Sequence, residues 1–182
     1  MSPEYRHFYD SRHVIDRLRH AHAIIMTPHL TSICSATSFT AVFGPEAYPP
    51  SLLVTEQTLT ANEQAINEAA RLMQMELYGT YSAQSFLFLL NHPYTQGALF
   101  LTDIHVPRKT PQEKIITHVT AVVPSEIRSV NQLKPVRYYV VDTGNSPFLY
   151  QTDIEGALDM YINAHACFIV TRSVIPERLQ EE

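Results

Sequence analysis

The spacing of hydrophobic residues changes from a helical period in the first half of the chain to a strand period in the second half. Apolar side chains recur every three or four residues in four segments, which predicts helices over about 11–26, 34–43, 61–77 and 83–92. Runs rich in β-branched residues predict strands at 98–101, 115–123, 136–141, 148–151 and 166–171. Helices followed by a mostly antiparallel sheet make an α+β fold, and we expect the helix over 34–43 to pack against the sheet.

Capping signals mark the ends of several predicted helices. The box Thr60–Glu63 begins the helix over 61–77, Ser82 caps the helix that stops before Pro93, and a second box, Thr152–Glu155, begins one more helix before the last strand.

The spacing of apolar residues also predicts which face of two of these helices is buried. In the helix over 61–77 the expected buried stripe is Ile66, Ala69, Ala70, Met73 and Leu77. In the first helix it is Val14, Ile15, Leu18, His22 and Ile25, with Arg12, Asp16, Arg17 and Arg19 mostly on the solvent side.

The length of 182 residues suits one well-buried domain. We expect a single domain at 1–182, with a helical part at 1–95, a sheet part at 96–172 and a solvated tail at 173–182. A net charge of −5 and the absence of a basic run argue against nucleic acid as a partner.

Cellular location is also constrained by the sequence. The N-terminus lacks the apolar stretch of a signal peptide, no apolar run is long enough to span a bilayer, and only two cysteines occur. These features predict a soluble cytoplasmic protein, with delivery into a host or neighbouring cell by a signal-independent route left open. His20 and His22 cannot share a helical face and have no acidic or thiol neighbours to complete a ligand set, so neither a metal nor a cofactor is expected.

The strongest chemical signal is Cys34, which falls in the first turn of the predicted helix over 34–43. Pro28 and the pair Thr31-Ser32 supply a loop and caps before it. The positive end of the helix dipole and the unpaired N–H groups of a first turn favour a thiolate over a thiol. Cys34 is therefore a candidate nucleophile, whereas Cys167 is expected to be a core strand residue.

A base and an orienting acid are available on two successive predicted strands. His118 lies near the start of the strand over 115–123, and Asp142 ends the strand over 136–141 at a Gly-Asn turn. If these strands pair, the start of the first lies beside the end of the second, which makes His118 and Asp142 neighbours. This arrangement permits a Cys–His–Asp triad.

The order of these three motifs resembles the papain-like cysteine hydrolase superfamily, and within it the bacteriocin-leader-processing peptidases and related bacterial effector proteases and deamidases. The small-residue run Cys34–Ser38, the strand led by His118 and the strand ended by Asp142 carry the resemblance. It implies a papain-like fold with Cys34 as nucleophile, His118 as base and Asp142 as its orienting group. Members usually carry a Gln five or six residues before the Cys. Here those positions hold Pro28 and His29, which departs from the family's pattern, and we expect His29 to donate to the oxyanion in place of the Gln, alongside the backbone N–H of Cys34.

The implied function is a cysteine hydrolase or acyl transferase that cleaves, deamidates or transamidates an amide bond of a protein or peptide substrate, with Tyr138, Tyr139 and Tyr150 as candidates for lining its groove. Two alternatives stay open. One is a non-catalytic binding module on the same fold with Cys34 inert. The other is a two-histidine phosphoesterase, suggested by the triplets His29-Leu30-Thr31 and His118-Val119-Thr120. The sequence carries no signal for the oligomeric state.

Overall fold

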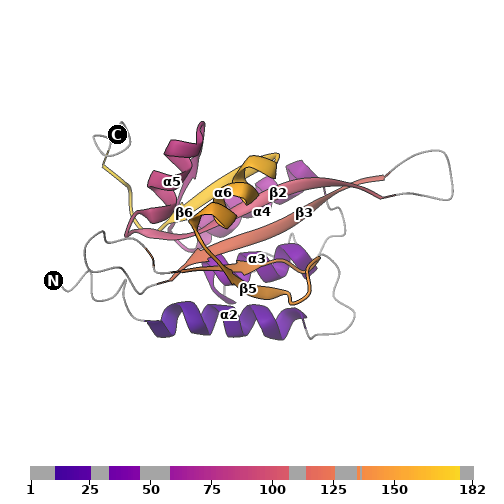
Figure 1. Ribbon diagram of the computed structural model, residues 1–182, viewed down its shortest axis with the longest axis horizontal. Helices are drawn as coiled ribbons and strands as arrows, with labels where there is room; N and C mark the ends of the chain where they lie inside the picture. The colour runs from indigo at the N-terminus through magenta and orange to yellow at the C-terminus, as the bar shows by residue number, and fades with distance from the viewer. Residues whose placement is uncertain are drawn as a thin grey trace.

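The computed structural model describes residues 11–25, 33–45, 58–106, 114–125, 135 and 137–176. Within these residues the chain has an α+β fold, as expected, with five helices and one six-stranded antiparallel sheet (Figure 1). The helices are α2 (Ser11–Ile25), α3 (Ile33–Phe43), α4 (Leu59–Leu72), α5 (Ala83–Asn91) and α6 (Ile154–Asn163). The strands are β1 (Glu76–Gly79), β2 (Thr95–Val106), β3 (Lys114–Pro124), β4 (Tyr138–Val141), β5 (Leu149–Thr152) and β6 (Ala166–Thr171).

The strands lie in the order β1-β6-β2-β3-β4-β5, and each pairs antiparallel with its neighbour. All five predicted strands are present, and the one predicted at 98–101 is the centre of the longer strand β2. None of the described helices is both long enough and apolar enough to cross a membrane.

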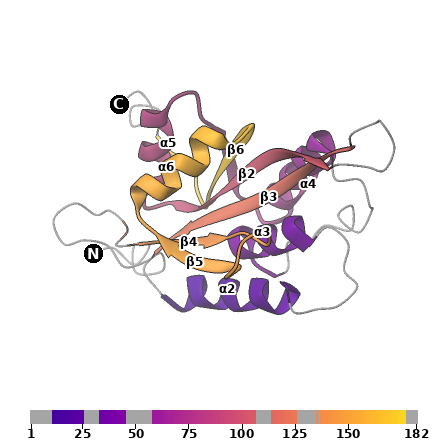
Figure 2. The same cartoon turned by 45° about the vertical axis from the view of Figure 1, so that its right-hand side comes forward.

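Helices cover both faces of the sheet, as Figure 2 shows for α2 and α3 on one side and α5 and α6 on the other. Alternate strand residues face the two layers, as the pleat of a strand requires. On β2, Leu99 and Leu101 join the core under α2, α3 and α4, whereas Ala98 and Phe100 join the core under α5 and α6. The molecule therefore has two apolar cores separated by the sheet.

Helix α3 is the most deeply buried element of the first core. Every residue from Cys34 to Phe43 is buried, since α2 covers one side of the helix and the sheet covers another. Gly97 on β2 allows the close approach, because a Cβ built there would lie 3.0 Å from Val42 Cγ2 and 3.0 Å from Val122 O. The prediction that this helix packs against the sheet is confirmed.

The buried face of α2 differs from the expected one. Val14, Leu18 and Ala21 are buried, but Arg17 is buried with them at 7% exposure, while Ile15 is 42% exposed and His22 also faces solvent. The reason is polar: Arg17 Nε donates to Ala41 O at 2.8 Å, where the last carbonyl groups of α3 need donors. The buried face of α2 therefore includes Arg17 in place of Ile15 and His22. The spacing of apolar residues could not predict this, because it assigns every arginine to the solvent side.

Helix α4 begins two residues before the predicted start and ends five residues before the predicted end. Its N-cap is Thr58, whose side chain accepts from Ala61 N–H at 3.1 Å, so the proposed box at 60–63 lies inside the helix. The helix ends at Leu72 and is followed by a left-handed residue, Gln74, with φ of 54°. Leu77 therefore lies in β1 and not in the helix, and a strand occurs inside the part of the chain expected to be helical.

The remaining caps are close to prediction. Ser82 caps α5 by accepting from Ser85 N–H at 3.1 Å, and that helix ends before Pro93, as predicted. In α6 the cap is Asp153, one residue after the predicted box begins, and it accepts from Gly156 N–H at 2.9 Å.

Candidate active site

Cys34 lies in the first turn of α3, as the sequence predicts, and its side chain is a free thiol with 7% exposure. Its position puts it where the N–H groups of a helix start have no partners within the helix. The predicted caps Thr31 and Ser32 and the predicted oxyanion donor His29 lie outside the described residues.

His118 and Asp142 are brought together by the pairing of β3 with β4. The register matches Ala121 with Val141, so the chain that leaves β4 runs beside the first half of β3. His118 Nε2 lies 2.7 Å from Asp142 Oδ1, and Gly144 N–H donates to the same oxygen at 2.9 Å. The prediction that these two side chains are neighbours is confirmed.

The third contact joins His118 to Cys34, whose side chains form a hydrogen bond. Since Nε2 of His118 faces Asp142, the other ring nitrogen, Nδ1, is the one available to the thiol. The imidazole thus lies between an acid that orients it and a sulfur that can give it a proton.

The ionisation of the three groups follows from these contacts. Hydrogen bonds to Asp142 and to Cys34 raise the pKa of His118 to about 9, against the opposing effect of burial. Burial alone would raise the pKa of Cys34, but its hydrogen bonds to His118 and to the backbone of Val119 lower it below its ordinary value. The hydrogen bond from His118 lowers the pKa of Asp142. All three directions favour a thiolate–imidazolium pair beside a carboxylate.

A backbone group that sequence reasoning missed completes the surroundings of the sulfur. Strand β4 ends at Val141, so the edge of β3 at Val119 lies beyond its partner strand. Helix α3 uses both polar groups there: the Val119 N–H is hydrogen-bonded to the Cys34 sulfur, and Ser38 Oγ donates to Val119 O at 3.0 Å. Cys34 and Ser38 are four residues apart and so share one helix face. In the sequence, these contacts with the backbone of Val119 are indicated by nothing more than a serine four positions after the cysteine.

We predict that Ser38→Ala both destabilises the fold and shifts the thiol. Removal of the hydroxyl leaves the carbonyl of Val119 without this donor, which costs about 1–3 kcal/mol of unfolding free energy. It also loosens the register of α3 on β3, so the pH midpoint of Cys34 alkylation is expected to rise. Urea unfolding and iodoacetamide rates against pH measure the two effects.

Thr40→Val is the matched control, because Thr40 lies on the same helix at 1% exposure and its hydroxyl has no hydrogen-bond partner among the described residues. The valine is expected to leave both the alkylation midpoint and the stability unchanged or to raise stability slightly. A Ser38→Ala protein that matches Thr40→Val in both measurements would contradict the role given to Ser38.

A second polar link ties the start of α3 to α4. Ser35 Oγ donates to Asn62 Oδ1 at 2.7 Å, and Asn62 Nδ2 donates to Thr58 O at 2.9 Å. Both side chains are buried, at 1% and 3% exposure. Since Ser35 directly follows Cys34, this link fixes the first turn of α3 against the first turn of α4.

The three tyrosines proposed to line a groove separate in the structure. Tyr138 is 3% exposed in the core under α5 and α6, where its hydroxyl donates to Asn91 Oδ1, so it cannot line a groove. Tyr139 borders an apolar hollow of about 310 Å³ between α2 and β5. Burial and the charge of Asp142 raise the pKa of Tyr150, which places that phenol near the carboxylate.

The second thiol behaves differently. Cys167 lies on β6 in contact with the core under α5 and α6, and burial raises its pKa to about 12. It therefore serves as an internal reference for Cys34. Among the described residues no group of three His, Cys, Asp or Glu side chains is placed to hold a metal ion.

A scan against protein-family models, a search of curated proteins and a search of solved structures each found no match to this chain.

Proposed function

We propose that this protein is a cysteine hydrolase or acyl transferase that acts on an amide bond of a protein or peptide substrate. The observation that carries the proposal is the position of His118, which is hydrogen-bonded to Asp142 at 2.7 Å and to the thiol of Cys34 at the start of a buried helix. A nucleophile, a base and an orienting group within hydrogen-bond reach form the constellation that covalent catalysis needs.

The fold class supports a papain-like assignment. Helix α3, with the candidate nucleophile in its first turn, packs on an antiparallel sheet whose adjacent strands β3 and β4 supply the other two groups. This is the order of elements on which the resemblance rests.

In the proposed reaction the Cys34 thiolate attacks the carbonyl carbon of the amide and forms a carbon–sulfur bond. The oxyanion that develops accepts from N–H groups at the start of α3, including that of Cys34. The tetrahedral species collapses as the carbon–nitrogen bond breaks, and the imidazolium of His118 gives its proton to the leaving nitrogen. Asp142 holds the ring in the orientation that makes this transfer possible.

The product depends on what attacks the resulting thioester. His118, now neutral, takes a proton from the attacking group, and the thiolate of Cys34 leaves. Water on a peptide acyl group completes peptide cleavage, water on a glutamine acyl group completes deamidation, and an amine completes transamidation. The same three residues serve all three outcomes.

The engagement of His118 favours this proposal over a two-histidine phosphoesterase. In the latter, the histidine turns a ring nitrogen toward the phosphodiester. Here one ring nitrogen faces Asp142 and the side chain also bonds Cys34, so both nitrogens already have roles.

The test is acyl transfer from p-nitrophenyl acetate, followed by release of p-nitrophenolate and by mass spectrometry of the chain. Cys34 is expected to gain the acetyl group at pH 7 more than about tenfold faster than Cys167, because only Cys34 has its pKa lowered. The acetyl group is then expected to leave by hydrolysis with the help of His118. Equal labelling of the two thiols, or none at Cys34, would overturn the proposal.

Two variants test the separate roles of the nucleophile and the base in acetylation and deacetylation. Cys34→Ala removes the acceptor and should abolish labelling at that position, whereas His118→Gln keeps the thiol and should slow both acetylation and deacetylation. Incubation of the wild type with a peptide library, with and without an added amine, then distinguishes new termini, deamidated glutamines and amine adducts.

A further inference from the structure

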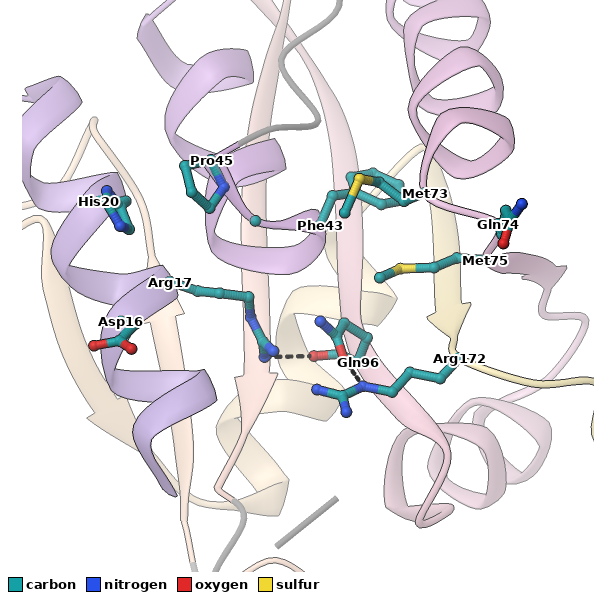
Figure 3. A pocket seen from close by; sticks show the side chains of 11 residues that line it. Asp16, Arg17, His20, Phe43, Pro45, Met73, Gln74, Met75, Gln96 and Arg172 are labelled. Carbon is teal, nitrogen blue, oxygen red and sulfur yellow. Dashed lines mark hydrogen bonds between the residues drawn. The ribbon is translucent and has the colours of Figure 1, made fainter. Parts of the chain in front are cut away.

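A cavity of about 470 Å³ lies at the end of α3 opposite the candidate nucleophile, and Arg17 and Arg172 approach Gln96 on its wall (Figure 3). Arg17 Nη2 donates to the backbone oxygen of Gln96 at 3.4 Å, and Arg172 Nε donates to its side-chain oxygen at 2.5 Å. These bonds tie α2 and the end of β6 to β2, so the polar groups of this cavity serve the packing of the fold. The hollow between α2 and β5 is built differently.

This hollow has a volume of about 310 Å³ and a mainly apolar lining. It is lined by Ile15, Leu18, Arg19 and His22 of α2, by Tyr139 of β4 and by Leu149 of β5. Strand β5 lies beside α2 in both Figure 1 and Figure 2, so the hollow is at the outer edge of the sheet. Ile15 is 42% exposed, which leaves a large apolar side chain in contact with water at this edge. Burial of a further apolar side chain here is therefore favourable.

The outer edge of β5 offers backbone groups beside the hollow. Among the described strands, none pairs with the side of β5 that faces away from β4. Asp142 N–H donates to Phe148 O at 2.9 Å, which makes these two residues a hydrogen-bonded pair of the hairpin. Bonded and non-bonded pairs alternate along antiparallel strands, so the N–H and C=O groups of Leu149 and Gln151 point away from β4. An extended peptide can bind such groups as an added strand.

The side of this hairpin that faces α2 carries positive charge. Arg19 is exposed and lines the hollow. Arg137 Nη1 donates to Gln151 Oε1 at 3.3 Å, and because side chains two positions apart share a face, Arg137 lies on the same side as Tyr139. Neither Arg19 nor Arg137 forms an ion pair with a carboxylate of the described residues. The rim of the hollow therefore complements an acidic partner.

We infer that the outer edge of β5 binds an extended acidic peptide segment, which pairs with the backbone of Leu149 and Gln151 and places one apolar side chain in the hollow. Hydrogen bonds between main chains supply affinity for an extended segment, and the hollow and the two arginines select its side chains. Because side chains alternate along a strand, an apolar residue and the acidic residues two positions away from it all face α2.

The position of this edge connects it to the candidate triad. Leu149 lies opposite Val141, which directly precedes Asp142, so a docked segment lies along the hairpin that carries the acid. The assignment of the segment to a protein substrate rests on the proposed function. The binding itself does not require Cys34 and can be measured without catalysis.

The test is fluorescence anisotropy of labelled peptides with the Cys34→Ala protein, which cannot process them. The heptapeptide TETLTET places one leucine and two glutamates on the same face of an extended strand. It is expected to bind about tenfold more tightly than TETSTET, which lacks the apolar side chain, and about threefold or more tightly than TKTLTKT, which reverses the charge. Equal affinities for TETLTET and TETSTET, or no saturable binding of TETLTET, would overturn the inference.

Two variants locate the site. Ile15→Ser and Arg19→Gln change exposed residues of the lining and should each weaken TETLTET binding about threefold or more. Leu72→Ser and Arg71→Gln are the matched controls, because both residues are exposed on α4 outside the hollow, and binding should stay within about twofold. Unchanged binding in Ile15→Ser and Arg19→Gln, with the fold intact by urea unfolding, would place the peptide elsewhere and contradict the inference.

Strand addition is tested by N-methylation of alternate residues of TETLTET, because only alternate N–H groups of an added strand face β5. One set of N-methyl groups should weaken binding about tenfold or more, and the other set should have a much smaller effect. Equal losses for the two sets would rule out strand addition. Sedimentation of the free protein tests another occupant: a dimer that Ile15→Ser dissociates would put a second copy of the chain at this edge in place of the peptide.

The outcomes separate this inference from the proposed function. Peptide binding that depends on Ile15 and Arg19 supports docking at β5 even where no acyl group is transferred from p-nitrophenyl acetate. Acyl transfer to Cys34 without saturable peptide binding would support the proposed function and overturn the docking site.

Discussion

Replacing His118 with alanine is expected to slow the alkylation of Cys34 at pH 7 by about one to two orders of magnitude. Burial is the largest influence on this thiol and raises its pKa, and the contacts with His118 are the main ones that oppose it. Without them the pKa should return to its ordinary value of 9.0 or above, where about one molecule in a hundred or fewer is a thiolate at pH 7. The higher intrinsic nucleophilicity of a more basic thiolate offsets part of the loss.

The measurement is the rate of iodoacetamide labelling between pH 5 and pH 10 in a Cys167→Ser background, so that one thiol remains. The wild-type profile should show a reactive thiolate near neutral pH, and the variant should become reactive only at alkaline pH. His118→Gln is a second variant that keeps most of the side-chain volume and so keeps the sulfur buried. Identical profiles with and without His118 would show that the pair does not activate Cys34.

The candidate site could be predicted from sequence because its parts follow local rules. A cysteine ahead of a buried apolar helix must lie at the helix start, and successive antiparallel strands bring the end of one beside the start of the other. These two rules are sufficient to place Cys34 in a first turn and to make His118 and Asp142 neighbours.

The contacts of Val119 could not be predicted in the same way. They depend on where β4 stops, because that is what leaves the backbone of β3 available to α3. Strand ends are set by the whole sheet and by the turn at 143–148, whereas a residue pattern gives strand positions only to within a few residues. The sequence therefore places Ser38 on the helix over 34–43 but does not identify the carbonyl group of Val119 as its hydrogen-bond acceptor.

The end of α4 was mispredicted for a different reason. The usual signal for a helix end is a glycine in the left-handed conformation, and here Gln74 adopts it. The backbone bonds around it, from Met75 N–H to Ala70 O at 2.8 Å and from Gln74 N–H to Arg71 O at 3.2 Å, are those of a normal helix terminus. Because Leu77 continued the helical spacing past this point, the spacing suggested one long helix where the chain forms a helix and a strand.

Replacing Cys34 with serine is expected to make the free energy of unfolding fall more steeply with pH than it does in the wild type, because only one of two opposing titrations is left. The raised pKa of His118, about 9 against 6.5 in the unfolded chain, stabilises the fold below pH 6.5, and this stabilisation is lost as pH rises through 9. The lowered pKa of Cys34 acts in the opposite direction, because its stabilisation grows as pH rises toward 9.

The two effects cancel when the groups form an ion pair. At a pH above both 6.5 and the lowered pKa of Cys34, and below 9, the folded pair holds one proton on His118, and the unfolded pair holds one proton on Cys34. The number of protons bound by the pair is then equal in the two states, so the pair adds nothing to the pH dependence of the free energy of unfolding. In Cys34→Ser the bond to Asp142, which is the largest cause of the raised pKa of His118, remains, but the contribution of the thiolate is lost. The pKa of His118 therefore stays above its ordinary 6.5 and below its wild-type value, and between 6.5 and that pKa the folded state holds a proton that the unfolded state lacks. The unfolding free energy of the variant should therefore fall by about 1 kcal/mol between pH 7 and pH 9 relative to the wild type.

Urea unfolding of both proteins across this range, with Cys167→Ser in each, measures the difference directly. Groups other than this pair are shared by the two proteins, so their titration drops out of the comparison. Adding His118→Gln to Cys34→Ser should remove the extra slope, because Asp142 then has no imidazolium beside it and the proton that distinguishes the two states is gone. If the slopes of wild type and Cys34→Ser are equal, Cys34 holds its proton throughout the range, and the resting site is a neutral thiol beside His118 instead of an ion pair.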